Sequence, residues 1–187
     1  MALVDDELER MNRMVSDLLL LAQSEQPAFL RPQKVHVGML TREAFDKVSL
    51  LGDHEFALEG AAELHAVLDP QRITQAMVAL ADNACRYTQP GGRIRLGSRL
   101  EGRWLRFWIT DSGPGISHED RARIFDRFAR GAAARRSDGA GLGLAIVRAI
   151  AVAHGGDVVL DGVDGRGSTF SVVIPHVLDQ VQPWPGS

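Results

Sequence analysis

The sequence predicts an α+β fold, a two-layer sandwich in which helices cover one face of a mixed β-sheet. Segments with helical periodicity alternate with paired segments of strand periodicity, mostly arranged as antiparallel hairpins. In one hairpin, residues 93–96 and 105–109 flank a turn at Glu101-Gly102; in another, residues 158–160 are followed by residues 170–174. A chain of 187 residues has room for one such core and a short additional element.

The other elements of the body have recognisable ends. Asp69 is placed to cap a helix that begins with Pro70, whose missing N–H costs nothing at the first helical position, and that runs to about Thr88. Periodicity and flanking turns predict three further features: a helix at 40–48, a pair of strands within 55–68 separated by a weak turn signal, and a helix at 141–154 that ends at Gly155-Gly156.

The N-terminal segment, residues 3–24, has the spacing of a helix that belongs in a bundle. Its apolar stripe consists of Val4, Leu8, Met11, Val15, Leu18 and Ala22, widened by Met14 and Leu21. The stripe needs cover, either from another helix or from the body of the same chain. Pro27 and Pro32 interrupt helix formation after it. We therefore expect a helical unit at 1–26, a linker at 27–34, a domain at 35–178 and a flexible tail at 179–187.

Composition argues against several classes of partner. The net charge of -3 and the pI of about 6.1 provide no basic surface for nucleic acid. A single cysteine, Cys85, excludes an internal disulfide and indicates a cytoplasmic protein. The longest apolar run, residues 18–22, is far shorter than the roughly 20 residues that cross a bilayer, so we expect no membrane span.

Four short motifs, each weak alone, occur in a specific order and spacing. In chain order they are Asp82-Asn83-Ala84-Cys85-Arg86-Tyr87-Thr88, Asp111-Ser112-Gly113-Pro114-Gly115-Ile116, Ile124-Phe125-Asp126-Arg127-Phe128 and Gly139-Ala140-Gly141-Leu142-Gly143-Leu144. Together they resemble the N box, first G box, F box and second G box of the sensor histidine kinases, in the superfamily that also holds gyrase, MutL and a heat-shock chaperone ATPase. The string Gly165-Arg166-Gly167-Ser168-Thr169-Phe170 resembles the last glycine motif of these kinases, although it also suits an ordinary hairpin turn.

This resemblance covers about residues 1–176 and implies the ATP-binding fold of the histidine kinases. Residues 10–22 are similar to the second helix of a histidine kinase dimerisation hairpin. The resemblance therefore implies that 1–26 is this second helix and that 35–178 is the catalytic ATP-binding domain. It also implies nucleotide contacts from residues of these motifs, among them Arg86, Tyr87, Phe128, Leu142 and Thr169.

Asn83 is the candidate metal ligand. It lies late in an apolar helix, where an amide needs polar partners, and Mg²⁺ beside nucleotide phosphates accepts such an oxygen. Capping of a neighbouring loop is the alternative role. Ala79, one turn earlier, occupies the position where gyrase and MutL carry a water-activating glutamate and histidine kinases a second asparagine. This favours phosphoryl transfer over hydrolysis, and it also leaves room for weakened metal binding in a degenerate kinase.

Asp111 is the candidate for recognition of adenine. A carboxylate only accepts hydrogen bonds, so at the base of a pocket it would accept one from the adenine amino group and repel the guanine carbonyl. Gly113 and Gly115 would let the backbone approach the base, and Ile116 would cover one of its faces. Asp-x-Gly is common in turns, so its weight comes from its position after an apolar strand.

Gly139, Gly141 and Gly143 lead into a helix, whose N-terminal amides and dipole suit a polyphosphate. A dinucleotide-binding motif is the competing interpretation. It fails because no strand precedes these glycines, and the chain has no Walker A lysine motif either.

The segment 121–136 holds six arginines and two phenylalanines, which fits a lid over the phosphates or a solvated loop. Either Arg127 or Arg130 is our candidate for steadying the transferred phosphoryl group, and these two arginines with Asn83 form the predicted catalytic set.

No histidine of the chain begins a phosphoacceptor box. The leading hypothesis is the catalytic part of a sensor histidine kinase, using ATP and Mg²⁺ and inactive alone. The acceptor histidine would come from a dimerisation domain, either in a missing N-terminal segment or on the partner subunit of a split kinase, with a response regulator downstream. Two alternatives remain open: a serine kinase like the bacterial anti-sigma factors, and a docking module that binds ATP without transferring phosphate.

Overall fold

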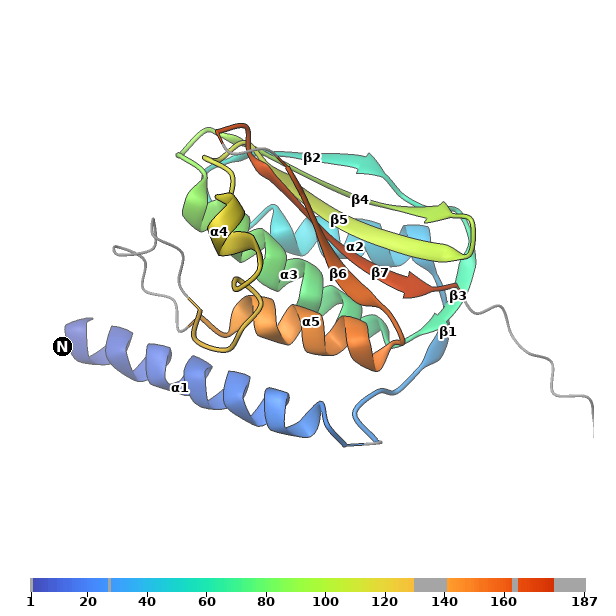
Figure 1. Cartoon of the computed structure of the whole chain (residues 1–187), viewed down its shortest axis with the longest axis horizontal. Coiled ribbons are helices and arrows are strands. Elements are labelled where there is room, and N and C mark those ends of the chain that lie inside the picture. Colours follow the sequence, from blue (N-terminus) through green and yellow to red (C-terminus); the bar gives the residue numbers. More distant parts are fainter. Residues whose placement is uncertain (1, 27, 130–140, 163–164, 177–187) are drawn as a thin grey trace, which may run out of the picture.

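The computed structural model describes residues 2–26, 28–129, 141–162 and 165–176, and it has the predicted α+β architecture (Figure 1). Its helices are α1 (Ala2–Gln23), α2 (Val37–Val48), α3 (Pro70–Tyr87), α4 (His118–Arg121) and α5 (Gly143–Ala153). Its strands are β1 (Gln33–His36), β2 (Glu55–Gly60), β3 (His65–Leu68), β4 (Arg93–Glu101), β5 (Trp104–Asp111), β6 (Asp157–Gly162) and β7 (Ser168–Pro175).

A mixed five-stranded sheet forms one layer, in the order β2-β4-β5-β7-β6. β2 and β4 run parallel and the other neighbouring strands run antiparallel. The helices α2, α3 and α5 lie together on one face of this sheet (Figure 1). Because side chains alternate along a strand, β5 buries Leu105, Phe107 and Ile109 against the helices while Trp104 faces the other way. The predicted two-layer sandwich is therefore confirmed.

The two strands expected within residues 55–68 form, but they belong to different sheets. β2 lies at one edge of the large sheet, whereas β3 pairs with β1 in a separate two-stranded sheet. Gly60, part of the weak turn signal, ends β2 and makes no hairpin turn. The Trp108 ring approaches it closely. Gly60 lies opposite Gly97, and a Cβ at Gly60 would be 3.2 Å from the Trp108 ring that crosses both glycines.

Helix α1 meets the body through residues near its C-terminal end. Leu20 and Leu21 are buried, and α1 runs alongside α5 (Figure 1). No helix in the described part of the chain is both long enough and apolar enough to cross a bilayer. Part of the apolar surface of α1 is left uncovered by the described residues, and we call this part the exposed stripe. It consists of Leu8, Met11, Val15, Leu18 and Leu19, which are between 41% and 58% exposed.

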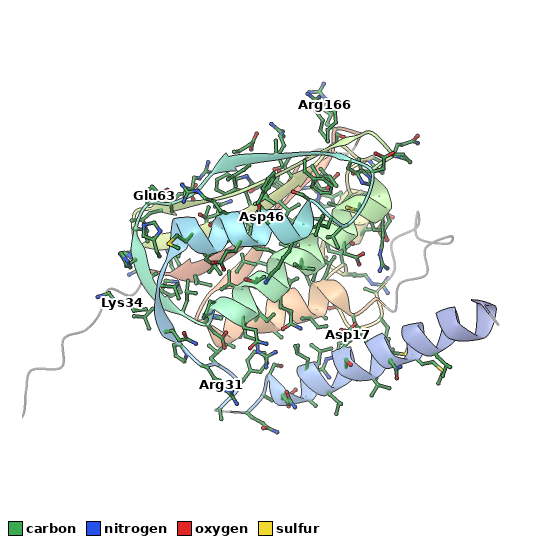
Figure 2. All side chains as sticks on the ribbon, turned by 180° about the vertical axis from the view of Figure 1, so that it is seen from behind. Asp17, Arg31, Lys34, Asp46, Glu63 and Arg166 are labelled. Carbon is green, nitrogen blue, oxygen red and sulfur yellow. The ribbon has the colours of Figure 1, made fainter. Side chains whose placement is uncertain are left out.

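The segment after α1 is held to the body by three contacts. Phe29 is buried, and the guanidinium of Arg72 lies 4.3 Å from the centre of its ring. The N–H of Arg31 donates to the Asp69 carboxylate at 2.8 Å. Figure 2 shows Arg31 on the segment that joins the end of α1 to the body. β1 starts at Gln33, so residues 33 and 34 of the expected linker belong to a strand.

His154 ties the end of α5 to the start of α3. Its Nε2 accepts from the Asp69 N–H at 3.1 Å, so its Nδ1 carries the proton and donates to the Ile150 carbonyl oxygen at 2.8 Å. Burial lowers the pKa of His154 below its ordinary value of 6.5, and the Ile150 carbonyl and the Asp69 charge offset this only in part. The folded protein therefore favours the neutral imidazole.

We expect stability to fall as the pH drops below about 6.5. Above that pH His154 is neutral in both states, whereas below it the unfolded chain binds a proton that the folded chain resists until its lower pKa is reached. Urea unfolding of the wild type and of His154→Gln between pH 7.5 and 5.5 measures this. The variant should lose less stability over the same interval, and equal losses in the two proteins would contradict the assignment.

Candidate functional site

The ends of several strands meet at one end of the large sheet, which we call the site edge: β5 ends there, and β4 and β7 begin there. The antiparallel register places Asp111, the last residue of β5, opposite Ile94 near the start of β4. It also places Thr110 opposite Thr169, near the start of β7, with their hydroxyl oxygens 2.9 Å apart. Motifs that are far apart in the sequence, including the predicted Asp111 and Thr169, are thereby brought side by side.

Asp111 is a buried carboxylate whose Oδ2 can still accept a hydrogen bond. It is 7% exposed, and its Oδ1 accepts from the Gly113 N–H at 2.8 Å and from the Ser168 N–H at 3.3 Å. Burial raises the pKa of Asp111 above its ordinary value, and the two backbone N–H donors lower it in part. Since both of these bonds use Oδ1, Oδ2 can accept from a ligand donor such as an amino group. The contribution of Ser168 was not predicted, because it depends on the pairing of β5 with β7.

Two glycines let the neighbouring backbone segments approach Asp111 closely. A Cβ at Gly113 would lie 2.8 Å from the carbonyl oxygen of Tyr87, at the end of α3. A Cβ at Gly167 would lie 2.1 Å from the carbonyl oxygen of Asp111, and Gly167 has a φ of +85°. Gly113 was a predicted site residue, whereas the role of Gly167 depends on a contact between distant segments. The close packing fixes the end of α3, the Asp111 turn and the start of β7 relative to one another.

The end of α3 carries the predicted Asn83, Arg86 and Tyr87. The helix forms as expected, with the Asp69 side chain accepting from the Arg72 N–H and Pro70 in the first turn. Asn83 is half-buried, between the buried residues Ala81 and Ala84 of α3. The predicted phosphate contact Arg86 forms an ion pair with Asp82 at 2.8 Å in this structure.

Gly115 and Ile116 continue the turn after Asp111. Gly115 has a φ of +76°, a conformation that favours glycine, and Ile116 is partly buried against the core. The Ile116 carbonyl oxygen accepts from Arg121 Nε at 3.3 Å, and another nitrogen of the same guanidinium bonds the Gly162 carbonyl oxygen. Arg121 thus fastens this turn to the end of β6. It was not predicted as a site residue, because an arginine in an arginine-rich segment gives no signal of its own.

The F box rests on the second G box. The Phe128 N–H donates to the Gly141 carbonyl oxygen at 3.0 Å. Gly141 has a φ of +70°, and a Cβ there would lie 2.9 Å from the Ala129 carbonyl oxygen. Phe128 itself has a φ of +64°, uncommon for a large side chain, and it is 57% exposed. The structure therefore brings the predicted Phe128 and Gly141 together. Arg130 and Gly139, also predicted, lie outside the described residues.

Helix α5 begins two residues later than expected and presents an open N-terminus. Leu142 is buried and takes the N-cap position without a side-chain hydrogen bond to the helix. A Cβ at Gly143 would meet no described atom within 4 Å. Among the described residues none covers this helix end, so the first N–H groups of α5 and the positive end of its dipole can bind an anion there. Leu142 and Gly143 are both among the predicted site residues.

Arg127, a predicted catalytic residue, has its guanidinium on a carboxylate in this structure. Its Nη2 lies 3.2 Å from Oε1 of Glu25, which follows the end of α1. Sequence reasoning could not foresee this contact, because the two residues are 102 positions apart.

The fold and these features are those of a nucleotide-binding protein. A buried carboxylate between glycine turns suits a purine, and a helix N-terminus suits a polyphosphate. Residues 68–178 match the family described as histidine kinase-, DNA gyrase B-, and HSP90-like ATPase. The chain belongs to this family.

Similar proteins include sensor histidine kinases. WalK of Bacillus subtilis (strain 168) is 30% identical over 187 residues, covering 96% of this chain and 31% of WalK. CusS of Escherichia coli O157:H7 is 34% identical over 178 residues, covering 91% of this chain and 36% of CusS. The structure of full-length ShkA in complex with AMPPNP is 32% identical with a TM-score of 0.77, covering 88% of this chain and 35% of ShkA. The chain thus spans about a third of each of these relatives.

Proposed function

We propose that this chain is the ATP-binding catalytic part of a two-component sensor histidine kinase and works in the cytoplasm. It transfers the γ-phosphoryl group of ATP to a histidine outside the described residues, in a further segment or on a partner, and a response regulator receives the phosphate. The observation that carries this proposal is the contact of the Asp111 turn with the end of α3, at the side of the body where α5 also begins (Figure 1). Relatives that match nearly the whole chain are sensor histidine kinases, which supports it.

Each part of this edge suits one part of ATP. The free Oδ2 of Asp111 accepts from the adenine amino group, while the Gly113–Ile116 turn and Thr169 lie beside the base. The amides at the start of α5 bind phosphate oxygens, with Leu142 holding the helix end in place. Arg86 leaves its ion pair with Asp82 and binds phosphate oxygens instead, and Tyr87 also contacts the nucleotide.

The residues present fit a Mg²⁺ that is held mainly by the nucleotide. Among the described residues, no group of three or more histidine, cysteine, aspartate or glutamate side chains could hold a metal ion by itself. Mg²⁺ beside phosphates keeps several waters, so a single amide oxygen from Asn83 is a sufficient protein ligand. When bound, the ion neutralises phosphate charge. Ala79 adds no ligand atom, so this chain should hold the ion less tightly than a protein with two asparagines on this face.

The position of Ala79 yields a gain-of-function prediction. Ala79→Asn places a second amide one helical turn before Asn83 on the same side of α3. We expect the Mg²⁺ concentration for half-maximal AMPPNP binding to fall about three- to tenfold, the effect of one added polar contact of about 1 kcal/mol. Ala79→Val serves as the control, because valine is closer to asparagine in size and its side chain has no oxygen to bind the ion. An unchanged Mg²⁺ requirement in Ala79→Asn would place the ion elsewhere.

Helix α1 has the features of a dimerisation helix. Its exposed stripe, from Leu8 to Leu19, faces away from the residues that bury Leu20 and Leu21. We propose that segment 1–26 is the second helix of a dimerisation hairpin and that segment 27–34 links it to the catalytic domain at 35–178. A helix bearing the acceptor histidine would cover the exposed stripe.

The test supplies the missing acceptor. The chain is mixed with γ-labelled ATP, Mg²⁺ and a histidine-bearing dimerisation domain, and we expect acid-labile phosphate on that histidine. A dimerisation domain whose histidine is replaced by glutamine is the control. Phosphate on a serine would instead indicate a kinase like the anti-sigma factors.

A docking module is the second candidate, and Ala79 is the observation that favours it. AMPPNP binding without transfer to any supplied histidine would support that function and overturn the kinase proposal.

A further inference from the structure

The ion pair between Arg127 and Glu25 joins the proposed catalytic centre to helix α1. Nη2 of Arg127 lies 3.2 Å from Oε1 of Glu25. Arg127 belongs to the F box, whereas Glu25 lies two residues beyond the end of α1. The pair therefore connects two segments that lie far apart in the sequence. One of its members, Arg127, is also the candidate for steadying the transferred phosphoryl group.

Each partner is anchored to an element that matters for the proposed reaction. On one side, Leu20 and Leu21 fix the C-terminal end of α1 against the body a few residues before Glu25. On the other side, Phe128 follows Arg127 directly and donates its N–H to Gly141. Gly141 precedes the cap of α5, whose N-terminus is the proposed phosphate site. A shift of α1 that moves Glu25 thus acts on Arg127 at the side of the phosphate-binding helix.

We propose that Glu25 is a positioning residue that holds Arg127 on the end of α1 and thereby restrains it from the nucleotide phosphates. The carboxylate offsets part of the positive charge that a phosphate would feel, and the ion pair favours one direction of the Arg127 side chain. Displacement of the end of α1 separates the pair and frees Arg127 for the phosphates. This inference rests on the proposed function, since it assumes a nucleotide at this edge of the sheet.

The strength of the ion pair suits a restraint that a small movement can release. The side chains of Arg127 and Glu25 are 57% and 75% exposed, so water screens their attraction. An exposed pair of this kind changes an equilibrium by about two- to fivefold. A restraint of this size lowers nucleotide affinity without preventing nucleotide binding.

The experiment measures AMPPNP affinity by calorimetry on the whole chain, in the presence of Mg²⁺ and without any acceptor. We expect Glu25→Gln to bind AMPPNP about two- to fivefold more tightly than the wild type. Arg127→Gln should bind more weakly than the wild type. Adding Glu25→Gln to Arg127→Gln should then produce no gain, because the carboxylate has no guanidinium left to restrain.

Glu43→Gln is the matched control, since Glu43 is an exposed glutamate on α2 and its replacement changes the net charge equally. A gain in Glu25→Gln that exceeds the gain in Glu43→Gln and vanishes in the Arg127→Gln background supports the proposal. Equal affinities of Glu25→Gln and the wild type, or the same gain with and without Arg127, overturn it while leaving the proposed kinase function intact. Failure of every variant and the wild type to bind AMPPNP overturns both.

Discussion

Gly167→Ala is expected to destabilise the domain by about 2–4 kcal/mol and to abolish AMPPNP binding at concentrations that saturate the wild type. Gly167 has a φ of +85°, where a non-glycine residue costs about 1–2 kcal/mol. The new Cβ would also lie 2.1 Å from the Asp111 carbonyl oxygen, so one of the two backbones has to move. Displacement of Asp111 removes the proposed acceptor for adenine. Chemical denaturation measures the first effect and calorimetry with AMPPNP the second.

Gly165→Ala is the control that distinguishes the cost of the steric clash from the cost of the left-handed backbone conformation. Gly165 lies in the same loop with a φ of +80°, but a Cβ there would meet no described atom within 4 Å. We expect a cost of about 1–2 kcal/mol from the conformation alone, with AMPPNP affinity preserved. Equal losses in the two variants would mean that the contact between Gly167 and Asp111 contributes nothing to the site.

The contrast between these two glycines shows what the sequence could and could not predict. The Gly165–Phe170 motif is visible in the sequence, and both glycines look alike there. Their difference arises from the register of β5 against β7, which places the start of β7 beside Asp111. A register between strands that are almost 60 residues apart depends on the packing of the whole sheet, and no local pattern specifies it.

Local signals were sufficient where an element is specified by neighbouring residues. Asp69 and Pro70 at the start of α3 and Thr88 at its end are found as predicted, because capping is a contact between residues close in sequence. The amphipathic pattern of residues 3–24 likewise predicted a helix, and α1 forms over nearly the same range. The pattern did not reveal which side of α1 the body covers, since Leu20 is buried although it lies outside the predicted stripe.

Long-range contacts account for the rest of the differences. β3 pairs with β1, which lies about 30 residues earlier in the chain, and not with the neighbouring β2. The pairing of Arg127 with Glu25 and of Arg121 with Gly162 follows from the folding of distant segments onto each other. The motifs of the candidate site are visible in the sequence, while the contacts that hold these motifs together are not.

Asp111→Asn is expected to lower the affinity for AMPPNP about 100-fold without unfolding the protein. Asparagine keeps an oxygen that can accept from the Gly113 and Ser168 N–H groups, so the turn is preserved. Its Nδ2 then occupies the place of Oδ2 and points a donor at the adenine amino group, which is itself a donor. Loss of a charge-assisted hydrogen bond alone corresponds to about 10- to 100-fold, and the facing donors add to it.

The same substitution should shift base selectivity. Guanine presents a carbonyl oxygen where adenine has its amino group, and Nδ2 of asparagine can donate to it. We expect the ratio of AMPPNP to GMPPNP affinity to fall in Asp111→Asn. Asp46→Asn, an exposed aspartate on α2, is the matched control and should change neither affinity. A ratio that stays at the wild-type value would show that Asp111 does not contact the base.

Stability without nucleotide distinguishes a functional role of Asp111 from a structural one. Because burial raises the pKa of Asp111 in the folded state, stability is lost as the pH rises from 3.8 through the folded-state pKa, and the loss is complete above that pKa. Asp111→Asn removes the charge and should therefore unfold at an equal or higher temperature than the wild type when no nucleotide is present. A residue retained for the fold would show the opposite. A carboxylate that weakens the empty domain while strengthening its complex with ATP has been kept for binding.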